Sequence, residues 1–172
     1  VMGWYKRGLG APTPDPAAVY ECVSIEVVSH LRDFVIIRLD RGVSEEFEGA
    51  DFRSGTLGPL AAGEEVTIVG FPSGLPMKLD DAGEVLGAES FDRFVVRGDV
   101  FTGHSGAPVF DAGGRVAGLI GYGPEPDYEV RRGCARARQI DAERGDGIAA
   151  AYAFRAIHEL CKDRGPRRLC DA

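Results

Sequence analysis

The sequence of 172 residues has no apolar run close to the roughly 20 residues that a membrane-spanning helix needs. Its densest apolar stretch, Ile148 to Phe154, is far shorter. No basic segment followed by an apolar one opens the chain, so no signal peptide is visible. We therefore expect no membrane partner, and these features leave the cellular compartment open.

Metal-binding spacings are missing as well. The four cysteines form no C-x-x-C pair, and no His or Cys pair has the spacing of metal ligands. We therefore predict no metal and no cofactor. The disulfide pairing stays open among Cys22, Cys134, Cys161 and Cys170.

An excess of positive charge is also absent. Twenty Lys and Arg residues stand against 27 Asp and Glu residues, which gives a formal net charge of −7. This balance offers no electrostatic reason to expect a nucleic-acid partner. One small basic cluster is interpreted as a solvated face: Arg131, Arg132, Arg136 and Arg138. The oligomeric state is left undetermined.

Turn-forming residues, in contrast, are abundant. The 24 glycines and 10 prolines are too many for a helical bundle, and they favour short strands joined by tight loops. Alternating or continuous apolar patterns predict six strands, at Val19–Val28, Phe34–Leu39, Glu65–Phe71, Phe91–Arg97, Ala107–Phe110 and Arg115–Tyr122. The β-branched run at Phe34–Leu39 is typical of a more buried strand. The sequence thus predicts an all-β protein.

Two further elements follow from local signals. Asp80-Asp81-Ala82-Gly83 predicts a hairpin turn between Met77–Leu79 and Glu84–Leu86. One helix is predicted to begin near Asp146, a good N-cap, and to end before Gly165-Pro166. Its apolar stripe would hold Ala151, Phe154, Ile157 and Cys161.

The segment most informative about chemistry is Gly103-His104-Ser105-Gly106. A serine between glycines can occupy a sharp turn where the backbone amides of Gly103 and Ser105 converge on one point, as a developing oxyanion requires. Alone, this tetrapeptide is more often a structural turn than a nucleophile. Its position between two predicted strands distinguishes it from the strand-to-helix elbow of an α/β-hydrolase.

Four motifs together resemble the trypsin-like (chymotrypsin-fold) serine peptidases over about Val19 to Tyr122. Ser105-Gly106-Ala107-Pro108-Val109 looks like the nucleophile motif, and the segment from Gly118 to Gly123 looks like the strand that lines the substrate cleft. The segment from Asp33 to Leu39 is similar to the one with the triad aspartate. The segment from Val69 to Pro76 resembles bacterial, glutamyl-endopeptidase-like members.

The resemblance implies roles for individual residues. Ser105 would be the nucleophile, Gly103 and Ser105 would supply the oxyanion-hole amides, and Asp33 would orient a histidine base. Gly121, Tyr122 and Gly123 would pair with the backbone of a peptide or protein substrate. Asp99 would lie at the base of the specificity pocket. A secreted or periplasmic location is favoured by the same resemblance.

It also implies a fold, a chymotrypsin-like double β-barrel with an incomplete first barrel and a C-terminal helix. Within one peptidase domain, 1–18 would form an irregular N-terminal segment and 19–60 the partial first barrel. The core of the second barrel would be 61–123, and 124–172 would form a loop plus the terminal helix. Too few strands precede Asp40 to close a six-stranded barrel. The second barrel is expected from about Glu65 to Tyr122.

The family's catalytic histidine has no counterpart in the chain. His30 is too close in sequence to Asp33 to face it from another strand, and His104 adjoins Ser105 in a turn where neighbouring side chains point apart. His158 belongs to the predicted helix. We therefore expect a serine endopeptidase-type hydrolase that is inactive as this isolated chain. The alternative is a catalytically dead fold that binds peptides or proteins through the same cleft.

Overall fold

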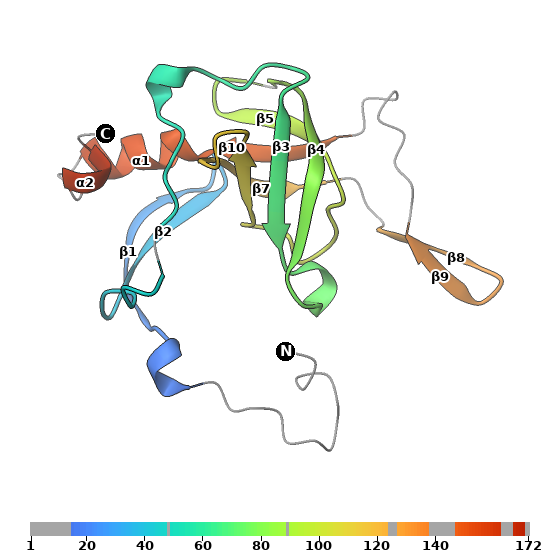
Figure 1. The fold of residues 1–172 in the computed structure, drawn as a ribbon, viewed down its shortest axis with the longest axis horizontal. Helices are drawn as coiled ribbons and strands as arrows, with labels where there is room; N and C mark the ends of the chain where they lie inside the picture. Colours follow the sequence, from blue (N-terminus) through green and yellow to red (C-terminus); the bar gives the residue numbers. More distant parts are fainter. Residues whose placement is uncertain are drawn as a thin grey trace.

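The computed structural model describes residues 15–47, 49–88, 90–123, 127–137, 147–162 and 167–170. At its centre is a closed antiparallel barrel with the strand order β10-β5-β4-β3-β6-β7 (Figure 1). Its strands are β3 (Glu65–Gly70), β4 (Lys78–Ala88), β5 (Arg93–Arg97), β6 (Pro108–Asp111), β7 (Val116–Tyr122) and β10 (Ile148–Tyr152). The prediction of a mostly antiparallel β protein is confirmed.

Smaller elements surround the barrel. Two antiparallel pairs stand beside it, β1 (Cys22–Ser29) with β2 (Phe34–Leu39) and β8 (Tyr128–Arg131) with β9 (Cys134–Ala137). The helices α1 (Ala153–Lys162) and α2 (Arg167–Cys170) follow β10. Short 3-10 turns occupy Pro16–Ala18, Gly55–Leu57 and Pro72–Gly74. No helix in the described part of the chain is long and apolar enough to cross a membrane.

Alternating side chains of the barrel strands fill its interior, as the period of two residues requires. The largest fully buried side chains are Tyr152, Phe94, Ile68, Val85, Val96 and Val109. The rings of Phe94 and Tyr152 lie 4.7 Å apart between centroids. At Gly118 the backbone passes so close to this pair that a Cβ atom would meet the Phe94 ring and lie 2.6 Å from the Ala151 carbonyl oxygen. The packing of β7 against the core therefore depends on that glycine.

The helix predicted from Asp146 is wrong in its first part. Asp146 itself lies outside the described residues, and residues 148–152 form β10, which closes the barrel between β5 and β7. All five β10 side chains are buried, and the helix begins only at Ala153. Pairing with two distant strands outweighs the high helix propensity of the alanine run, because tertiary context overrides local preference.

The predicted hairpin at residues 80–83 is also wrong. These residues continue one 11-residue strand, β4, which pairs with β3 along one side and with β5 along the other. Bulges between Val66 and Ile68 and between Val85 and Gly87 bend the pairing. Gly83 lies against the Val66 carbonyl, where a Cβ would be 2.7 Å away. The glycine therefore permits a close approach of strands instead of a turn.

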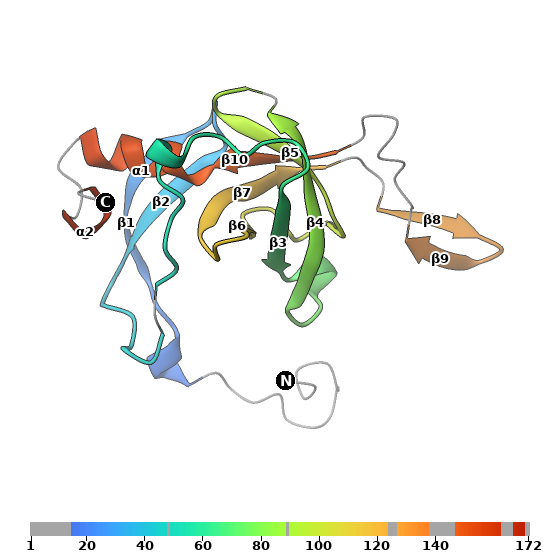
Figure 2. The same ribbon diagram turned by 45° about the horizontal axis from the view of Figure 1, so that its top comes forward.

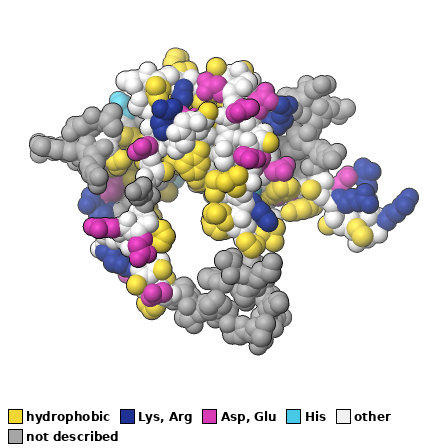
Figure 3. Space-filling view, in the orientation of Figure 1, with side chains coloured by type: hydrophobic (Ala, Val, Ile, Leu, Met, Phe, Trp, Pro, Cys, Tyr) yellow, Lys and Arg dark blue, Asp and Glu magenta, His cyan; other side chains and the backbone are white. Residues whose placement is uncertain are grey.

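The β1–β2 pair, which we call the arm, stands apart from the barrel (Figures 1 and 2). Its side chains are largely exposed, with Ile25 64% and Ile37 46% accessible. The expected burial of Phe34–Leu39 is thus wrong except at Phe34, because the described elements leave most of the arm uncovered. Figure 3 shows hydrophobic side chains on the arm and on the lower end of the barrel, on either side of a hollow. The exposed apolar residues from the end of β3 to the start of β4 include Phe71, Leu75, Met77 and Leu79.

The arm is fixed to the barrel at the turn between its strands. Arg32 donates hydrogen bonds to Asp92 at 3.0 Å and to Glu159 of α1 at 2.9 Å. Arg93 of β5 donates to the Leu31 carbonyl at 2.9 Å. Strand β5, the residue before it and α1 thus hold residues 31 and 32, while the rest of the arm extends away from them.

Two features of the C-terminal part were not assigned from sequence. The stretch interpreted as a loop contains the β8–β9 hairpin, whose Arg131, Arg132 and Arg136 are exposed; Arg138 lies outside the described residues. A disulfide joins Cys161 of α1 to Cys170 of α2. The two remaining cysteines, Cys22 and Cys134, are free and exposed.

Candidate active site

Ser105 lies at the exposed tip of a tight turn that precedes β6. The His104 amide donates to the Phe101 carbonyl at 3.0 Å, and the Ala107 amide donates to the His104 carbonyl at 2.7 Å. The Gly106 amide donates to the Ile120 carbonyl of β7 at 2.7 Å, which ties the turn to the barrel. The Ser105 side chain is therefore presented by a rigid element, as a nucleophile requires.

Two backbone donors beside the serine have no acceptor in the described part of the chain. No described residue accepts a hydrogen bond from the Gly103 or Ser105 amide. Gly103 has a φ of +101°, and a Cβ atom there would lie 2.9 Å from the Phe71 carbonyl oxygen. Glycine is thus required by both conformation and space. The arrangement leaves the two amides available to an incoming oxyanion.

Asp33 and Ser105 come from distant parts of the chain and meet at Gly121 of β7. The Ser105 hydroxyl donates to the Gly121 carbonyl at 3.3 Å. A Cβ atom at Gly121 would lie 3.1 Å from Oδ2 of Asp33. The carboxylate and the hydroxyl therefore both lie near Gly121, one from the arm turn and one from the barrel.

A cavity of about 460 Å³ lies beside Asp33. It is lined by residues of the arm and the barrel: Val28, Ser29, His30, Asp33, Phe34, Val35, Gly106 and Leu119. Because Gly106 adjoins Ser105, this cavity reaches from the carboxylate toward the serine turn. It is large enough for an imidazole ring.

A second, smaller cavity of about 140 Å³ gathers most of the other predicted site residues. Gly103, Ser105, Gly121, Tyr122 and Gly123 all line it. On the β6 side, the backbone of Ile120 still bonds to Gly106 and Ala107, so this edge of β7 has no described backbone partner only from Gly121 onward. An extended peptide can use such a free edge.

Asp99 is the predicted residue that does not line this cavity. Its amide donates to Asp80 Oδ2 at 2.6 Å, and the lining begins with its neighbour Val100. The carboxylate of Asp127 lines the cavity instead. Sequence analysis did not single out Asp127, since its place here depends on a contact with Thr102 across 25 residues.

The three histidines have different environments. His104 is buried, with Nδ1 at 3.0 Å from the Phe101 amide and Nε2 packed against Gly70. His158 is exposed on α1, and His30 is exposed beside Asp33 in the larger cavity. No described histidine has a hydrogen bond to Ser105 or Asp33. His104 is therefore held as a structural residue of the turn.

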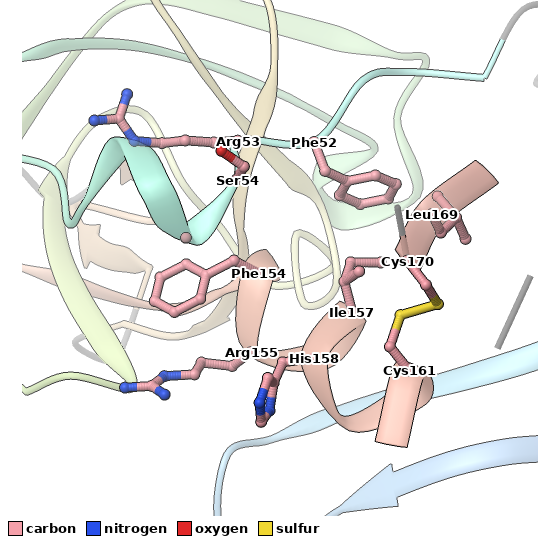
Figure 4. A pocket seen from close by; sticks show the side chains of 11 residues that line it. Phe52, Arg53, Ser54, Phe154, Arg155, Ile157, His158, Cys161, Leu169 and Cys170 are labelled. Carbon is pink, nitrogen blue, oxygen red and sulfur yellow. A yellow bond between two sulfur atoms is a disulfide. The ribbon is translucent and has the colours of Figure 1, made fainter. Parts of the chain in front are cut away.

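A third cavity, of about 370 Å³, lies between residues 52–55 and the two helices and shares no residue with the other two (Figure 4). Phe52, Phe154, Ile157, Leu169 and the disulfide give it apolar walls. Its two arginines are engaged elsewhere, Arg53 with Asp111 and Arg155 with Asp92. Its one hydroxyl group, of Ser54, bonds to the Thr56 hydroxyl at 2.6 Å and has no described hydrogen bond to His158.

Metal chemistry has no support in the described ranges. Nowhere in them do three or more His, Cys, Asp or Glu side chains gather in a way that could hold an ion. The chemistry available at the Ser105 turn is thus that of a hydroxyl, two backbone amides and a carboxylate.

Comparison with known proteins points to one family. Residues 11–119 match the family described as Trypsin-like peptidase domain. No curated protein sequence matches the chain significantly.

Solved structures similar in fold include the active form of the Rv3671c protease from M. tuberculosis, at 16% identity and a TM-score of 0.53, covering 77% of this chain and 54% of that one. The inactive serine-to-alanine mutant of that protease is 18% identical with a TM-score of 0.51, covering 77% of this chain and 60% of that one. A further inactive form is 18% identical with a TM-score of 0.52, covering 80% of this chain and 66% of that one. This chain thus spans between about half and two thirds of their length.

Proposed function

This chain belongs to the family of trypsin-like peptidase domains, and from that premise we propose that its Ser105 is the nucleophile of a serine endopeptidase-type hydrolase. The barrel and terminal helix agree with the chymotrypsin-like fold of that family. The substrate is a peptide or protein that binds along residues 121–123. No cofactor takes part.

The proposed reaction proceeds through an acyl-enzyme. Ser105 Oγ attacks the scissile carbonyl carbon while an imidazole removes the hydroxyl proton, and the amides of Gly103 and Ser105 stabilise the oxyanion. The imidazolium then protonates the leaving amine as the C–N bond breaks. Water, deprotonated by the same base, attacks the ester and returns Ser105 to its hydroxyl form. Asp33 orients the imidazole and stabilises its charged form.

One observation supports this proposal above the others: Ser105 and Asp33 approach Gly121 from different elements. Their separation in sequence makes such a meeting improbable for an unrelated serine turn and an unrelated arm carboxylate. The cavity beside Asp33 provides the space that an imidazole needs.

We further propose that this chain alone lacks its general base. His104 is buried and already bonded, and His158 lines a cavity without Ser105 or Asp33. His30 shares the Asp33 cavity but lies only three residues from Asp33, in the same turn. Without a base, the hydroxyl keeps its proton near neutral pH, and only the acceleration from the oxyanion hole and binding remains, of order 10³ to 10⁴ over water.

Three finer points remain part of the proposal. The segment from Val69 to Pro76 supports placement in the bacterial glutamyl-endopeptidase-like branch. Asp99, next to the cavity residue Val100, would act from behind the specificity pocket. A secreted or periplasmic location is in keeping with the family.

A second function is a peptide-binding module on the same fold. It is favoured by the absence of a described histidine bonded to Ser105 or Asp33. In that case the cleft binds extended peptides and does not cleave them.

The test is chemical rescue with added imidazole. The full chain is assayed on casein and on short ester substrates, with and without imidazole, and Ser105→Ala at each imidazole concentration supplies the non-enzymatic background. We expect negligible turnover alone and Ser105-dependent turnover with imidazole, lowered by Asp33→Asn. A chain extended upstream, if it brings a histidine, should be active without imidazole.

Each alternative has its own signature. Robust turnover by the short chain alone, lost in both Ser105→Ala and His30→Ala, would make His30 the base. Binding of extended peptides without turnover by either chain, even with imidazole, would favour the binding module and end the peptidase proposal.

A further inference from the structure

The β8–β9 hairpin begins with two residues that contact the Ser105 turn and the loop behind it. Asp127 Oδ2 accepts a hydrogen bond from the Thr102 amide at 2.6 Å. The Tyr128 ring stacks on Phe101 at 5.6 Å between centroids, and its hydroxyl lies 3.3 Å from the Ser73 hydroxyl. The hairpin is therefore attached beside the proposed oxyanion hole.

Thr102 is held on both of its backbone groups. While its amide donates to Asp127, its carbonyl accepts from the Ser73 amide at 2.6 Å. In a planar trans peptide, the Thr102 carbonyl and the Gly103 N–H point in opposite directions. A fixed Thr102 carbonyl therefore fixes the direction of the Gly103 N–H, which faces away from Ser73.

Gly103 cannot hold this orientation by itself. Glycine adopts positive and negative φ with similar ease, so a φ of +101° is maintained only by its surroundings. If the Thr102–Gly103 peptide rotated, its carbonyl would replace the N–H beside Ser105 and would repel a developing oxyanion. The anchor of Thr102 thus decides whether the turn presents a donor or an acceptor.

We propose that Asp127 is a positioning residue for the oxyanion hole, which it acts on through Thr102. This inference rests on the proposed function, since the orientation of Gly103 matters to catalysis only if Ser105 is a nucleophile. Hydrogen bonds to a carboxylate are shorter and about twice as strong as neutral ones, which suits a bond that, together with the one from Ser73, holds an exposed loop.

The orientation can be measured without catalysis. Thr102 and Gly103 are followed by ¹⁵N NMR in the full chain, in Asp127→Ala and in Asp127→Asn, whose amide oxygen can still accept the bond. Asp40→Ala is the matched control, because Asp40 likewise accepts one backbone amide, from Glu21 at 3.0 Å, but on the arm. Circular dichroism verifies that each variant folds. If Asp127→Ala does not fold, Asp127→Ser is used in its place, because its side chain is too short to reach Thr102.

In Asp127→Ala we expect hydrogen exchange at Thr102 to accelerate by about tenfold or more, with line broadening or a second signal at Gly103. Asp127→Asn should retain most of the original behaviour, and the control all of it. An unchanged Gly103 signal in Asp127→Ala would overturn the proposal, whether or not exchange at Thr102 changes.

Turnover in the extended or imidazole-rescued protein gives the second readout. Loss of an oxyanion-hole donor lowers kcat by about 10² to 10³, so Asp127→Ala should lower kcat toward this range with little change in KM, and Asp127→Asn should recover much of it. Unchanged kcat would overturn the proposal. If no variant and no wild-type protein turns over substrate, the peptidase proposal fails, while the NMR result still decides whether Asp127 orients Gly103.

Discussion

Replacement of Asp111 by alanine should destabilise the protein more than any other single carboxylate change in the described chain. Asp111 ends β6, and its side chain is only 2% exposed. Its oxygens accept from the Gly113 and Arg115 amides at 2.9 and 3.0 Å and from the Arg53 and Arg115 guanidinium groups at 3.0 Å. The Arg53 side chain is itself only 12% exposed.

Removal of one partner from a buried ion pair leaves the other charge without compensation, which costs about 3 to 5 kcal/mol. Arg53 keeps its bonds to the Gly58 and Leu57 carbonyls, so the lower end of this range is expected. For a chain of this length, Tm should fall by roughly 6 to 12 °C. Urea unfolding followed by circular dichroism measures the change. The exposed Asp40–Arg41 pair provides the control, where Asp40→Ala should lower the stability far less.

The effect should depend on pH. Burial by itself raises the pKa of Asp111, but the hydrogen bonds from the two amides and two guanidinium groups outweigh it and hold this pKa below its ordinary value of 3.8. The folded state thus binds the proton less readily than the unfolded state, so the stabilisation is complete above about pH 4 to 5 and is lost as the pH falls further. Wild type and Asp111→Ala should therefore converge in stability in acid. A loss equal to that of the Asp40 control, or a difference that grows in acid, would refute this reasoning.

Three shorter predictions concern other parts of the molecule. Gly118→Ala should cost about 1 to 3 kcal/mol in urea unfolding because its methyl group overlaps the Phe94 ring, and a neutral result would contradict the close approach described for β7. Ile25→Asp on the uncovered arm should lower self-association in analytical ultracentrifugation without loss of barrel stability, whereas unchanged association would mean that the arm is not a contact surface. The Cys161–Cys170 disulfide joins residues with a sequence separation of 9, and its reduction should lower the free energy of unfolding by about 2 to 3 kcal/mol. An unchanged Tm in the presence of reductant would argue against this stabilisation.

Local patterns were sufficient for the strands that flank the Ser105 turn. β7 lies within its predicted segment and β6 extends only one residue beyond its own, because their apolar residues alternate or run continuously between clear turn signals. The strand at residues 148–152 was missed because three consecutive alanines favour a helix locally, and only its pairing across the barrel, such as Ala149 with Tyr122, stabilises it as a strand.

The residues of the candidate site likewise include some that local sequence patterns predict and one that they do not. Ser105 and the segment after Gly118 stand out in sequence because motif and turn chemistry coincide there. Asp127 does not, since a carboxylate that accepts one amide bond across 25 residues leaves no local pattern. The burial of β2 was mispredicted for a related reason: a β-branched run indicates a surface suited to burial, but not whether anything covers it.

The position of β10 bears on how the chain is made. Synthesis proceeds from the N-terminus at about 5 to 20 residues per second, so β7 is complete roughly 1.5 to 6 seconds before β10 has been translated. During this interval β5 and β7 both have an unpaired edge, and Phe94 has no Tyr152 to cover it. An open edge beside uncovered apolar side chains is a template for wrong strand pairing. The nascent chain is therefore most in need of a chaperone while residues 123–147 are being translated, and slow codons in that stretch should lower the yield of folded protein.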